Sequence, residues 1–147
     1  MNRRRFVRRA VSTVVLDTSA LLAFLYGEPG EASVRRLLAD AVDGRVTVRL
    51  HRLHMTEAYY LFYRSRGERT AEAMVQDVQR LPVRIEDRIF PPLLREAGRL
   101  KASYRISLAD AFAAGLARLR GAALMSCDRK EFAPLESSGE VTVTWAR

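Results

Sequence analysis

The feature that most constrains the fold of this chain is an apolar run interrupted by one carboxylate, VSTVVLDTSALLAFLY, over residues 11–26. Val14, Val15 and Leu16 have no polar residue between them, which is typical of a strand buried on both faces of a parallel sheet. Asp17 would then stand at the carboxyl end of that strand. Ligands bind at this end in open α/β sheets, so Asp17 is a candidate site residue, and a turn or capping role explains it equally well.

The apolar residues after Asp17 predict a helix over residues 20–26. Thr18 and Ser19 are residue types that cap the start of a helix, and Gly27 is suited to end it.

Helices and strands are predicted to alternate along the rest of the chain. Apolar spacing of three and four predicts helices over residues 31–41, 54–66, 70–81, 91–100 and 107–120. Short β-branched or alternating runs predict strands over residues 45–50, 83–85, 122–125 and 140–145, the last at a sheet edge. With no repeat and no internal linker, this order predicts one α/β domain with three α/β/α layers and a mostly parallel central sheet.

The chain is strongly basic, with 25 Lys and Arg against 17 Asp and Glu and a formal net charge of +8. Lys101 and Lys130 are its only lysines, so 23 of the 25 are arginine. Arginine forms forked hydrogen bonds with phosphate, which favours a nucleic-acid partner. A genome whose codons favour Arg over Lys also explains part of this excess.

Residues 1–10, MNRRRFVRRA, carry five arginines, and we interpret them as a basic arm or an extension from an early start codon. Residues 11–147 form the predicted domain. The apolar segment after the arm contains Asp17 and lacks a small-residue cleavage site, which argues against a secretion signal, and it is too short to span a membrane. The single Cys127 excludes an internal disulfide framework. We therefore expect a cytoplasmic protein.

Three further acids occupy places comparable to that of Asp17. Asp110 lies in the first turn of the helix that starts at Ser107, Glu57 is placed in the first turn of an earlier helix, and Asp128 follows a strand. Each has an ordinary explanation, as part of a capping box, as a favourable charge for the helix dipole, or as a turn residue. Strand ends and helix starts meet at one edge of a parallel sheet, so these acids are also expected to converge.

Converging carboxylates need a counter-charge. Two of them about 4 Å apart repel by roughly 4 kcal/mol at an effective dielectric of about 20. Hard divalent cations such as Mg²⁺ and Mn²⁺ take oxygen ligands and would supply that charge. Such ions activate water and stabilise displacement at a phosphodiester, a substrate that suits a basic protein.

Four motifs together resemble the PIN-domain ribonucleases, specifically VapC-type toxins of bacterial toxin–antitoxin pairs. They are VVLDTSALLAFL around Asp17, MTEAYYL around Glu57, SLADAFAAGLA around Asp110 and LMSCDRKEF around Asp128. The resemblance spans nearly all of residues 12–145 in the family's order.

The resemblance implies a PIN-like domain with metal-dependent endoribonuclease activity, in which Asp17, Glu57, Asp110 and Asp128 surround Mg²⁺ or Mn²⁺. Asp17 and Asp110 would be direct ligands, whereas Glu57 and Asp128 would act through water or hold a second ion. Thr18 and Ser126 match positions that support the site. The resemblance also implies an RNA substrate such as tRNA or ribosomal RNA, a cognate antitoxin that masks the site, and a homodimer.

The chain departs from the family pattern at three places. The basic arm before Val11 is longer than usual. His51 and His54 stand where an apolar or Pro-containing segment is more common. Contact with RNA is one interpretation of them, and we favour partly exposed residues at a helix start, outside the metal site. Glu131 is either a further acid near the site or a solvated charge in a short helix, and the second interpretation is favoured.

Other functions remain as alternatives. A non-catalytic RNA-binding module on the same fold is the main one, and a metal-dependent phosphatase or DNA-directed nuclease is a weaker one. The chain has no GxxxxGK loop, GxSxG elbow, HExxH or CxxC motif. Cys127 has no obvious base beside it and is expected to be a small buried residue.

Overall fold

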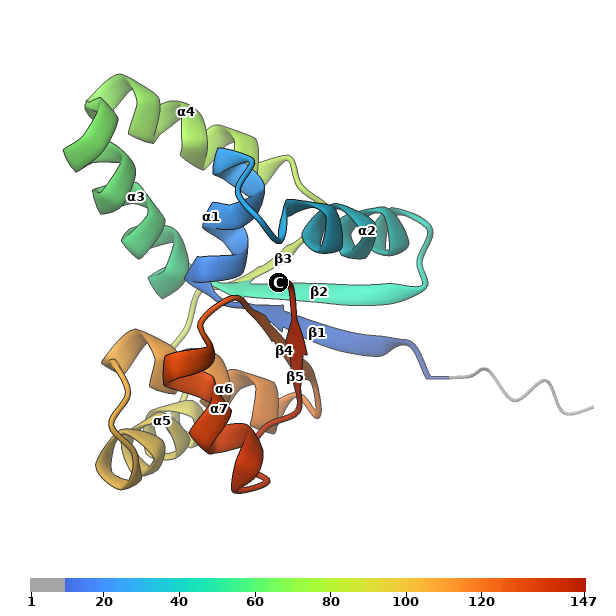
Figure 1. Ribbon diagram of the computed structural model, residues 1–147, viewed down its shortest axis with the longest axis vertical. Coiled ribbons are helices and arrows are strands. Elements are labelled where there is room, and N and C mark those ends of the chain that lie inside the picture. Colours follow the sequence, from blue (N-terminus) through green and yellow to red (C-terminus); the bar gives the residue numbers. More distant parts are fainter. Residues whose placement is uncertain (1–9) are drawn as a thin grey trace, which may run out of the picture.

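A computed structural model describes residues 10–147, and its strands form one five-stranded sheet (Figure 1). The strands are β1 Ser12–Leu16, β2 Val46–His51, β3 Arg84–Glu86, β4 Ala123–Ser126 and β5 Val143–Trp145. Their order is β3-β2-β1-β4-β5, and every neighbouring pair is parallel. The predicted α/β class and parallel sheet are therefore confirmed, with β5 at an edge as expected.

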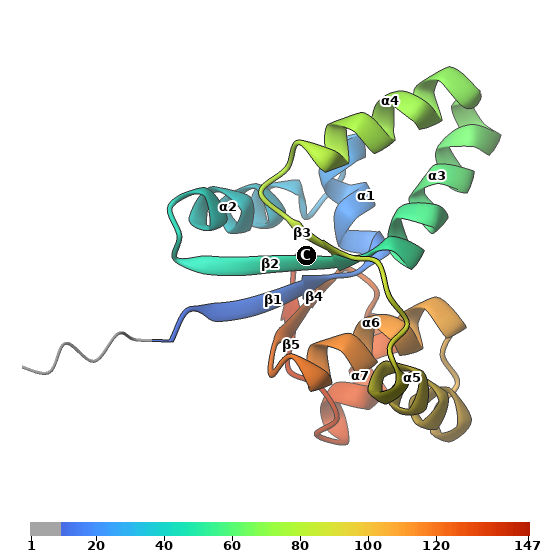
Figure 2. The same cartoon turned by 180° about the vertical axis from the view of Figure 1, so that it is seen from behind.

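Seven helices cover the two faces of the sheet in the described part of the chain. They are α1 Thr18–Tyr26, α2 Glu31–Val42, α3 Arg52–Arg66, α4 Glu68–Gln79, α5 Pro91–Ser103, α6 Leu108–Leu119 and α7 Arg129–Ser137. Helices α1 to α4 lie on one side and α5 to α7 on the other (Figure 1). Seen from behind, the chain leaves α4, runs along β3 and crosses to α5 in the other layer (Figure 2). The three-layer prediction is confirmed.

Two hydrophobic cores, one on each face, hold these layers against the sheet. The central strand β1 contributes to both, because Leu16 belongs to the core with α1 to α4 and Val15 to the core with α5 to α7. Both side chains are fully buried. Successive side chains of a strand point to opposite faces, so the uninterrupted apolar run before Asp17 is required by a sheet with helices on both sides.

Two helix starts differ from the predictions because of their capping residues. Helix α1 begins at Thr18, since Asp17 itself is the cap, in place of Thr18 or Ser19. Helix α3 begins at Arg52, since the Nδ1 atom of His51 accepts a hydrogen bond from the Leu53 N–H. Glu57 therefore lies in the second turn of α3, and the predicted first-turn position, with its helix-dipole explanation, is wrong.

Two other boundaries shift by a few residues. Helix α4 covers Glu68–Gln79 and begins directly after Gly67, two residues before the predicted start at residue 70. Strand β5 covers only Val143–Trp145 of the predicted 140–145. Two predicted boundary residues are confirmed: Gly27 ends α1 with φ of +66°, and Pro91 opens α5.

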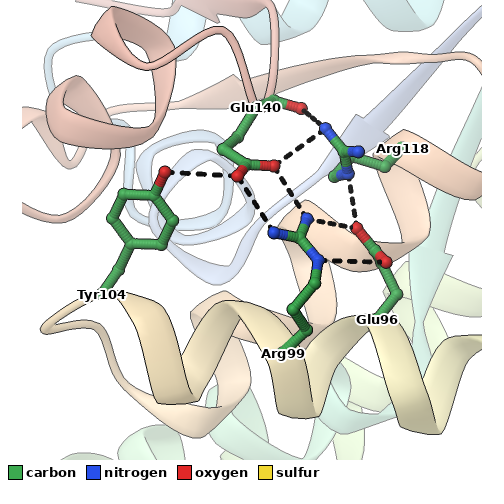
Figure 3. A network of polar contacts seen from close by, with 5 residues as sticks. All are labelled: Glu96, Arg99, Tyr104, Arg118 and Glu140. Carbon is green, nitrogen blue, oxygen red and sulfur yellow. Dashed lines mark hydrogen bonds and ion pairs between the residues drawn. The ribbon is translucent and has the colours of Figure 1, made fainter.

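A charged network ties α5 and α6 to the segment before β5 (Figure 3). The Glu140 carboxylate accepts hydrogen bonds from Arg99 at 2.8 and 3.0 Å and from the Tyr104 hydroxyl at 3.2 Å. Arg118 pairs with Glu140 at 2.9 Å and also with Glu96, which in turn pairs with Arg99 at 2.7 Å. Two carboxylates thus balance two guanidinium groups.

The predicted basic arm, residues 1–10, lies outside the described residues apart from Ala10. Within the described residues, none of the helices combines the length and apolar character needed to span a lipid bilayer.

Candidate metal centre

The acids predicted to converge lie at the carboxyl edge of the sheet or on the helices that begin there. Asp17 directly follows β1, and Asp128 lies two residues after the end of the neighbouring strand β4. Asp110 is in the first turn of α6, and Glu57 is in the second turn of α3. Parallel strands end at the same edge, so one edge of the sheet gathers acids that are as far as 111 positions apart in sequence.

Asp17 is held by hydrogen bonds on both of its carboxylate oxygens. Its Oδ1 atom accepts from the Ala20 N–H at 2.8 Å, which caps α1. The Ser19 hydroxyl lies 2.8 and 2.9 Å from the two oxygens, and the Ser126 hydroxyl donates to Oδ2. Because Asp17 is only 1% exposed, these donors fix the carboxylate in one orientation.

Ser19 was missed as a site residue by sequence reasoning. Its hydroxyl lies 3.1 Å from that of Ser126 and accepts a hydrogen bond from the Cys127 N–H at 2.9 Å. The Asp128 N–H donates to Ser126 Oγ at 2.9 Å. The two hydroxyls therefore connect the end of β1 to the end of β4. The available signal in the sequence was the hydroxyl of Ser19, two positions after Asp17. The sequence analysis interpreted Ser19 only as a helix cap.

The structure brings Asp110, Asp128 and Glu131 together, with one carboxylate oxygen from each lying within 4.8 Å of the others. Asp128 caps α7, accepting from the Glu131 N–H at 3.2 Å. The Oε2 atom of Glu131 is buried and has no hydrogen-bond partner among residues 10–147. The preferred interpretation of Glu131 as a solvated charge is therefore wrong, although the short helix that carries it is present.

Glu57 and Asp17 lie outside that group of three but close to it. The charges of Asp17, Glu131 and Glu57 all contribute to raising the pKa of Asp110. Thr18 Oγ1 donates a hydrogen bond to Glu57 Oε1, which links the start of α1 to α3. We call these five acids, Asp17, Glu57, Asp110, Asp128 and Glu131, the acidic cluster.

Burial and crowding make ionisation costly in the acidic cluster. Burial raises the pKa of Asp17 to about 6, with a smaller contribution from the Asp128 charge. Burial is also the largest cause of the rise in the pKa of Asp110 to about 7, followed by the neighbouring carboxylates. Groups with such pKa values occur at functional sites, where a cation or a proton offsets the crowded charge.

The donor set fits a hard divalent cation. All five side chains of the acidic cluster offer carboxylate oxygens, which Mg²⁺ and Mn²⁺ prefer. The buried oxygen of Glu131 without a partner is an available ligand atom. The carboxylates of Asp110, Asp128 and Glu131 lie close enough to contribute to one site.

The two histidines are buried, so the prediction that they are partly exposed is wrong. His51 is 2% exposed and His54 is 0% exposed. His54 Nε2 lies 2.9 Å from the carbonyl oxygen of Ala109, to which it can only donate. Burial lowers the pKa of His54 to about 4, so the ring is neutral at pH 7. His54 thereby ties α3 to the residue before Asp110.

Cys127 is buried and free, as expected. Burial raises the pKa of its thiol, which favours the unreactive protonated form.

The PIN domain family matches residues 14–135 of the chain. No curated protein matches the sequence. Similar solved structures are toxin–antitoxin proteins. VapBC2 from Rickettsia felis, bound to a promoter DNA fragment, is 16% identical with a TM-score of 0.73, covering 90% of this chain and 98% of that one.

Two further structures show the same fold. DNA-bound VapBC from Salmonella typhimurium is 17% identical with a TM-score of 0.68, covering 92% of this chain and 99% of that one. VapC20 from Mycobacterium tuberculosis, described as a sarcin-ricin loop cleaving toxin, is 21% identical with a TM-score of 0.65, covering 82% and 94%. The family match spans most of the chain, and the fold and the parallel-sheet topology agree with it: the protein belongs to the PIN-domain family.

Proposed function

We propose that this protein is a metal-dependent endoribonuclease that acts as the toxin of a toxin–antitoxin pair. The observation that carries the proposal is the acidic cluster, in which Asp110, Asp128 and Glu131 present oxygens within 4.8 Å of one another. The chain that carries this acidic site is basic overall, with a net charge of +8. Acids that bind a cation inside a basic protein suit a phosphodiester substrate.

We assign Asp17, Glu57, Asp110 and Asp128 to the catalytic metal site, as the family resemblance implies, and add Glu131. A divalent cation bound there would polarise the scissile phosphate and activate water. Neighbouring hydroxyl groups hold two of these acids in position. Ser19 and Ser126 hold the Asp17 carboxylate through hydrogen bonds to both of its oxygens, and Thr18 orients Glu57.

The proposed partners are RNA, in the form of tRNA or ribosomal RNA, and a cognate antitoxin. VapC20 is described as cleaving the sarcin-ricin loop, and other similar structures are toxin–antitoxin complexes. Exposed aromatic residues on α3, Tyr60 and Tyr63, offer a surface for the antitoxin or for a second copy in a homodimer. We place the activity in the cytoplasm, where the free Cys127 stays reduced.

The test is cleavage of a mixed pool of tRNA and ribosomal RNA by the antitoxin-free protein with Mg²⁺ or Mn²⁺. We expect discrete cuts that EDTA abolishes. Asp17→Asn should reduce the rate by on the order of 100-fold or more, since removing even an outer partner of a metal ligand costs about 10- to 100-fold. Asp77→Asn, which changes an exposed acid of α4 outside the acidic cluster, is the matched control and should cleave at the wild-type rate.

RNA binding without any cleavage at saturating Mn²⁺ would contradict the nuclease and favour the non-catalytic RNA-binding module. Cleavage of DNA in preference to RNA would instead redirect the proposal to a DNA-directed nuclease, because the same metal chemistry serves either phosphodiester.

A further inference from the structure

An exposed arginine beside the acidic cluster is held in place by an aromatic ring. Arg129 opens α7, directly after Asp128, and its guanidinium carbon lies 4.5 Å from the centre of the Trp145 ring. This is the shortest of the six arginine–aromatic contacts in the described part of the chain. The Nη2 atom of Arg129 also donates to the backbone oxygen of Arg147 at 3.0 Å.

Arg129 contacts the main-chain oxygen of Arg147, the last residue of the sequence, but no acidic side chain of the described residues pairs with it. Within residues 10–147 it forms no ion pair with an Asp or Glu side chain, in contrast to Arg99 and Arg118. Lys130, the next residue in the sequence, and Arg147, whose main-chain oxygen Arg129 contacts, are both exposed and add to the positive charge. The guanidinium N–H groups that do not contact Arg147 are therefore available to an anionic ligand.

The position of Trp145 places this pair at the edge of the sheet that carries the acids. Trp145 ends β5 and pairs in register with Ser126, whose hydroxyl donates to Asp17. Neighbouring strands lie about 4.8 Å apart, so the backbone of Trp145 is one strand away from the site. Figure 1 shows α7 and β5 next to each other in this region. The indole is half-buried against the core with α5 to α7, and its N–H lies 3.4 Å from Glu136, which fixes the ring.

We propose that Arg129, stacked on Trp145, binds a nucleobase and the adjoining phosphate of single-stranded RNA next to the acidic cluster. This inference rests on the proposed ribonuclease function and identifies a substrate-positioning residue for it. A planar guanidinium held on an aromatic ring offers its exposed side to a base, and its N–H groups bind phosphate. Stacking of this kind is tolerant of sequence, so the Arg129–Trp145 pair would contribute affinity more than choice of base.

Trp145 is the only tryptophan of the chain, so its fluorescence reports on this pair directly. The experiment titrates a short single-stranded RNA into the protein in EDTA, where cleavage is absent, and follows Trp145 emission. We expect saturable quenching. Arg129→Ala should weaken RNA binding roughly 5- to 100-fold, the range of one base–aromatic stack. Arg129→Lys, which keeps the charge but loses the plane, should recover only part of the affinity.

The matched control is Arg64→Ala, which removes another exposed guanidinium lying over an aromatic ring, here Tyr60 at 5.5 Å. Arg64 is seven residues beyond Glu57 on α3, or roughly 10 Å along the helix axis. We expect Arg64→Ala to change the affinity for RNA by less than twofold.

In cleavage assays with Mn²⁺, Arg129→Ala should raise KM and leave kcat unchanged. The thermal unfolding of Arg129→Ala should match that of the wild type.

RNA binding that leaves Trp145 emission unchanged, or equal affinity for wild type and Arg129→Ala, would overturn the inference. Equal quenching by an acidic peptide would overturn the stacking of a base, because the site would then recognise charge alone. If wild type and Arg129→Ala cleave RNA with the same KM, the ribonuclease stands and this inference falls. If quenching and the loss in Arg129→Ala occur without any cleavage, the RNA site stands and the ribonuclease falls.

Discussion

Asp110 shows how burial and neighbouring charge act on a single side chain. Its pKa rises from an ordinary value of 3.8 to about 7, first through burial and then through Asp17, Glu131 and Glu57. A carboxyl group whose pKa is raised in the folded state contributes stability that is fully present below pH 3.8. That contribution is lost as the pH rises through about 7, because the folded state must then ionise a disfavoured group.

We predict that Asp110→Asn stabilises the metal-free protein at pH 8, because the amide has no charge to bury. The gain should shrink as the pH falls from 8 to 5. Thermal unfolding followed by circular dichroism in EDTA measures it, with each 1 kcal/mol appearing as roughly 3 °C in a domain of this size. The exposed Asp77→Asn is the control and should show no such trend. A melting temperature for Asp110→Asn below that of the wild type at pH 8 would contradict the raised pKa of Asp110 and its cause.

Glu131 is the residue whose role the structure changed most. Its sequence neighbours, Lys130 and Phe132, do not predict that the carboxylates of Asp110 and Asp128 lie beside it. We predict that Glu131→Gln lowers Mn²⁺ affinity about 10-fold or more, since the substitution keeps the size and removes one anionic oxygen. Isothermal titration with MnCl₂ measures this.

The control for Glu131 is Glu136→Gln in the same helix, because the Glu136 carboxylate instead contacts the Val143 N–H and the Trp145 indole. It should bind Mn²⁺ as the wild type does. Unchanged affinity in Glu131→Gln would return Glu131 to a structural role.

At the scale of secondary structure, the charged network of Figure 3 connects α5 and α6 to the segment before β5. Arg99 is the main cause of the lowered pKa of both Glu96 and Glu140. A carboxylate with a lowered pKa in the folded state adds stability above its ordinary value near 4.5, and this stability is lost as the pH falls below that value.

We predict that Glu140→Gln lowers the stability at pH 7 by about 1 kcal/mol, a figure reduced for the solvent exposure of the arginines. The loss should fade as the pH falls from 4.5 through the lowered pKa of Glu140 in the folded state, because the wild-type carboxylate then becomes protonated as well. Chemical denaturation at pH 7 and at an acidic pH below that lowered pKa tests this. Glu31→Gln, which breaks one exposed pair with Arg35, is the control and should cost less than half as much. An equal loss at both pH values would point to packing in place of charge.

The ends of the helices could be predicted where a cap is local in sequence. Ser107 accepts from the Asp110 N–H at 3.0 Å, and Gly27 adopts a left-handed conformation, as their residue types indicate. His51 as the cap of α3 was not predictable in this way, because histidine is an uncommon cap. Its ring is held here by a contact between Nε2 and the Arg88 backbone oxygen at 3.1 Å, 37 positions away.

For the whole molecule, the acidic cluster couples metal binding to stability. The wild-type protein should gain about 2.7 kcal/mol at a Mn²⁺ concentration 100 times the Kd, which corresponds to roughly 5 to 10 °C. We predict that the double variant Asp110→Asn, Asp128→Asn loses this thermal shift. Differential scanning fluorimetry with MnCl₂ and with NaCl of equal ionic strength separates binding from screening. The same shift in the double variant would place the ion elsewhere.

The sequence by itself determined the α/β order of elements, the buried central strand and the positions of four acids. Those features depend on local periodicity, on caps such as Ser107 and on an apolar run that only a two-sided sheet can bury. It also carried the family resemblance, since the motifs around Asp17 and Asp110 are contiguous.

Only the tertiary structure decided the inclusion of Glu131 in the acidic cluster, the burial of His51 and His54, and the contacts of Ser19 and Trp145. Each of these depends on residues distant in sequence: Glu131 on Asp110, His54 on Ala109, and Trp145 on Arg129. Burial and partnership of a polar group are properties of the packed chain, because they are set by which elements the parallel sheet brings to one edge.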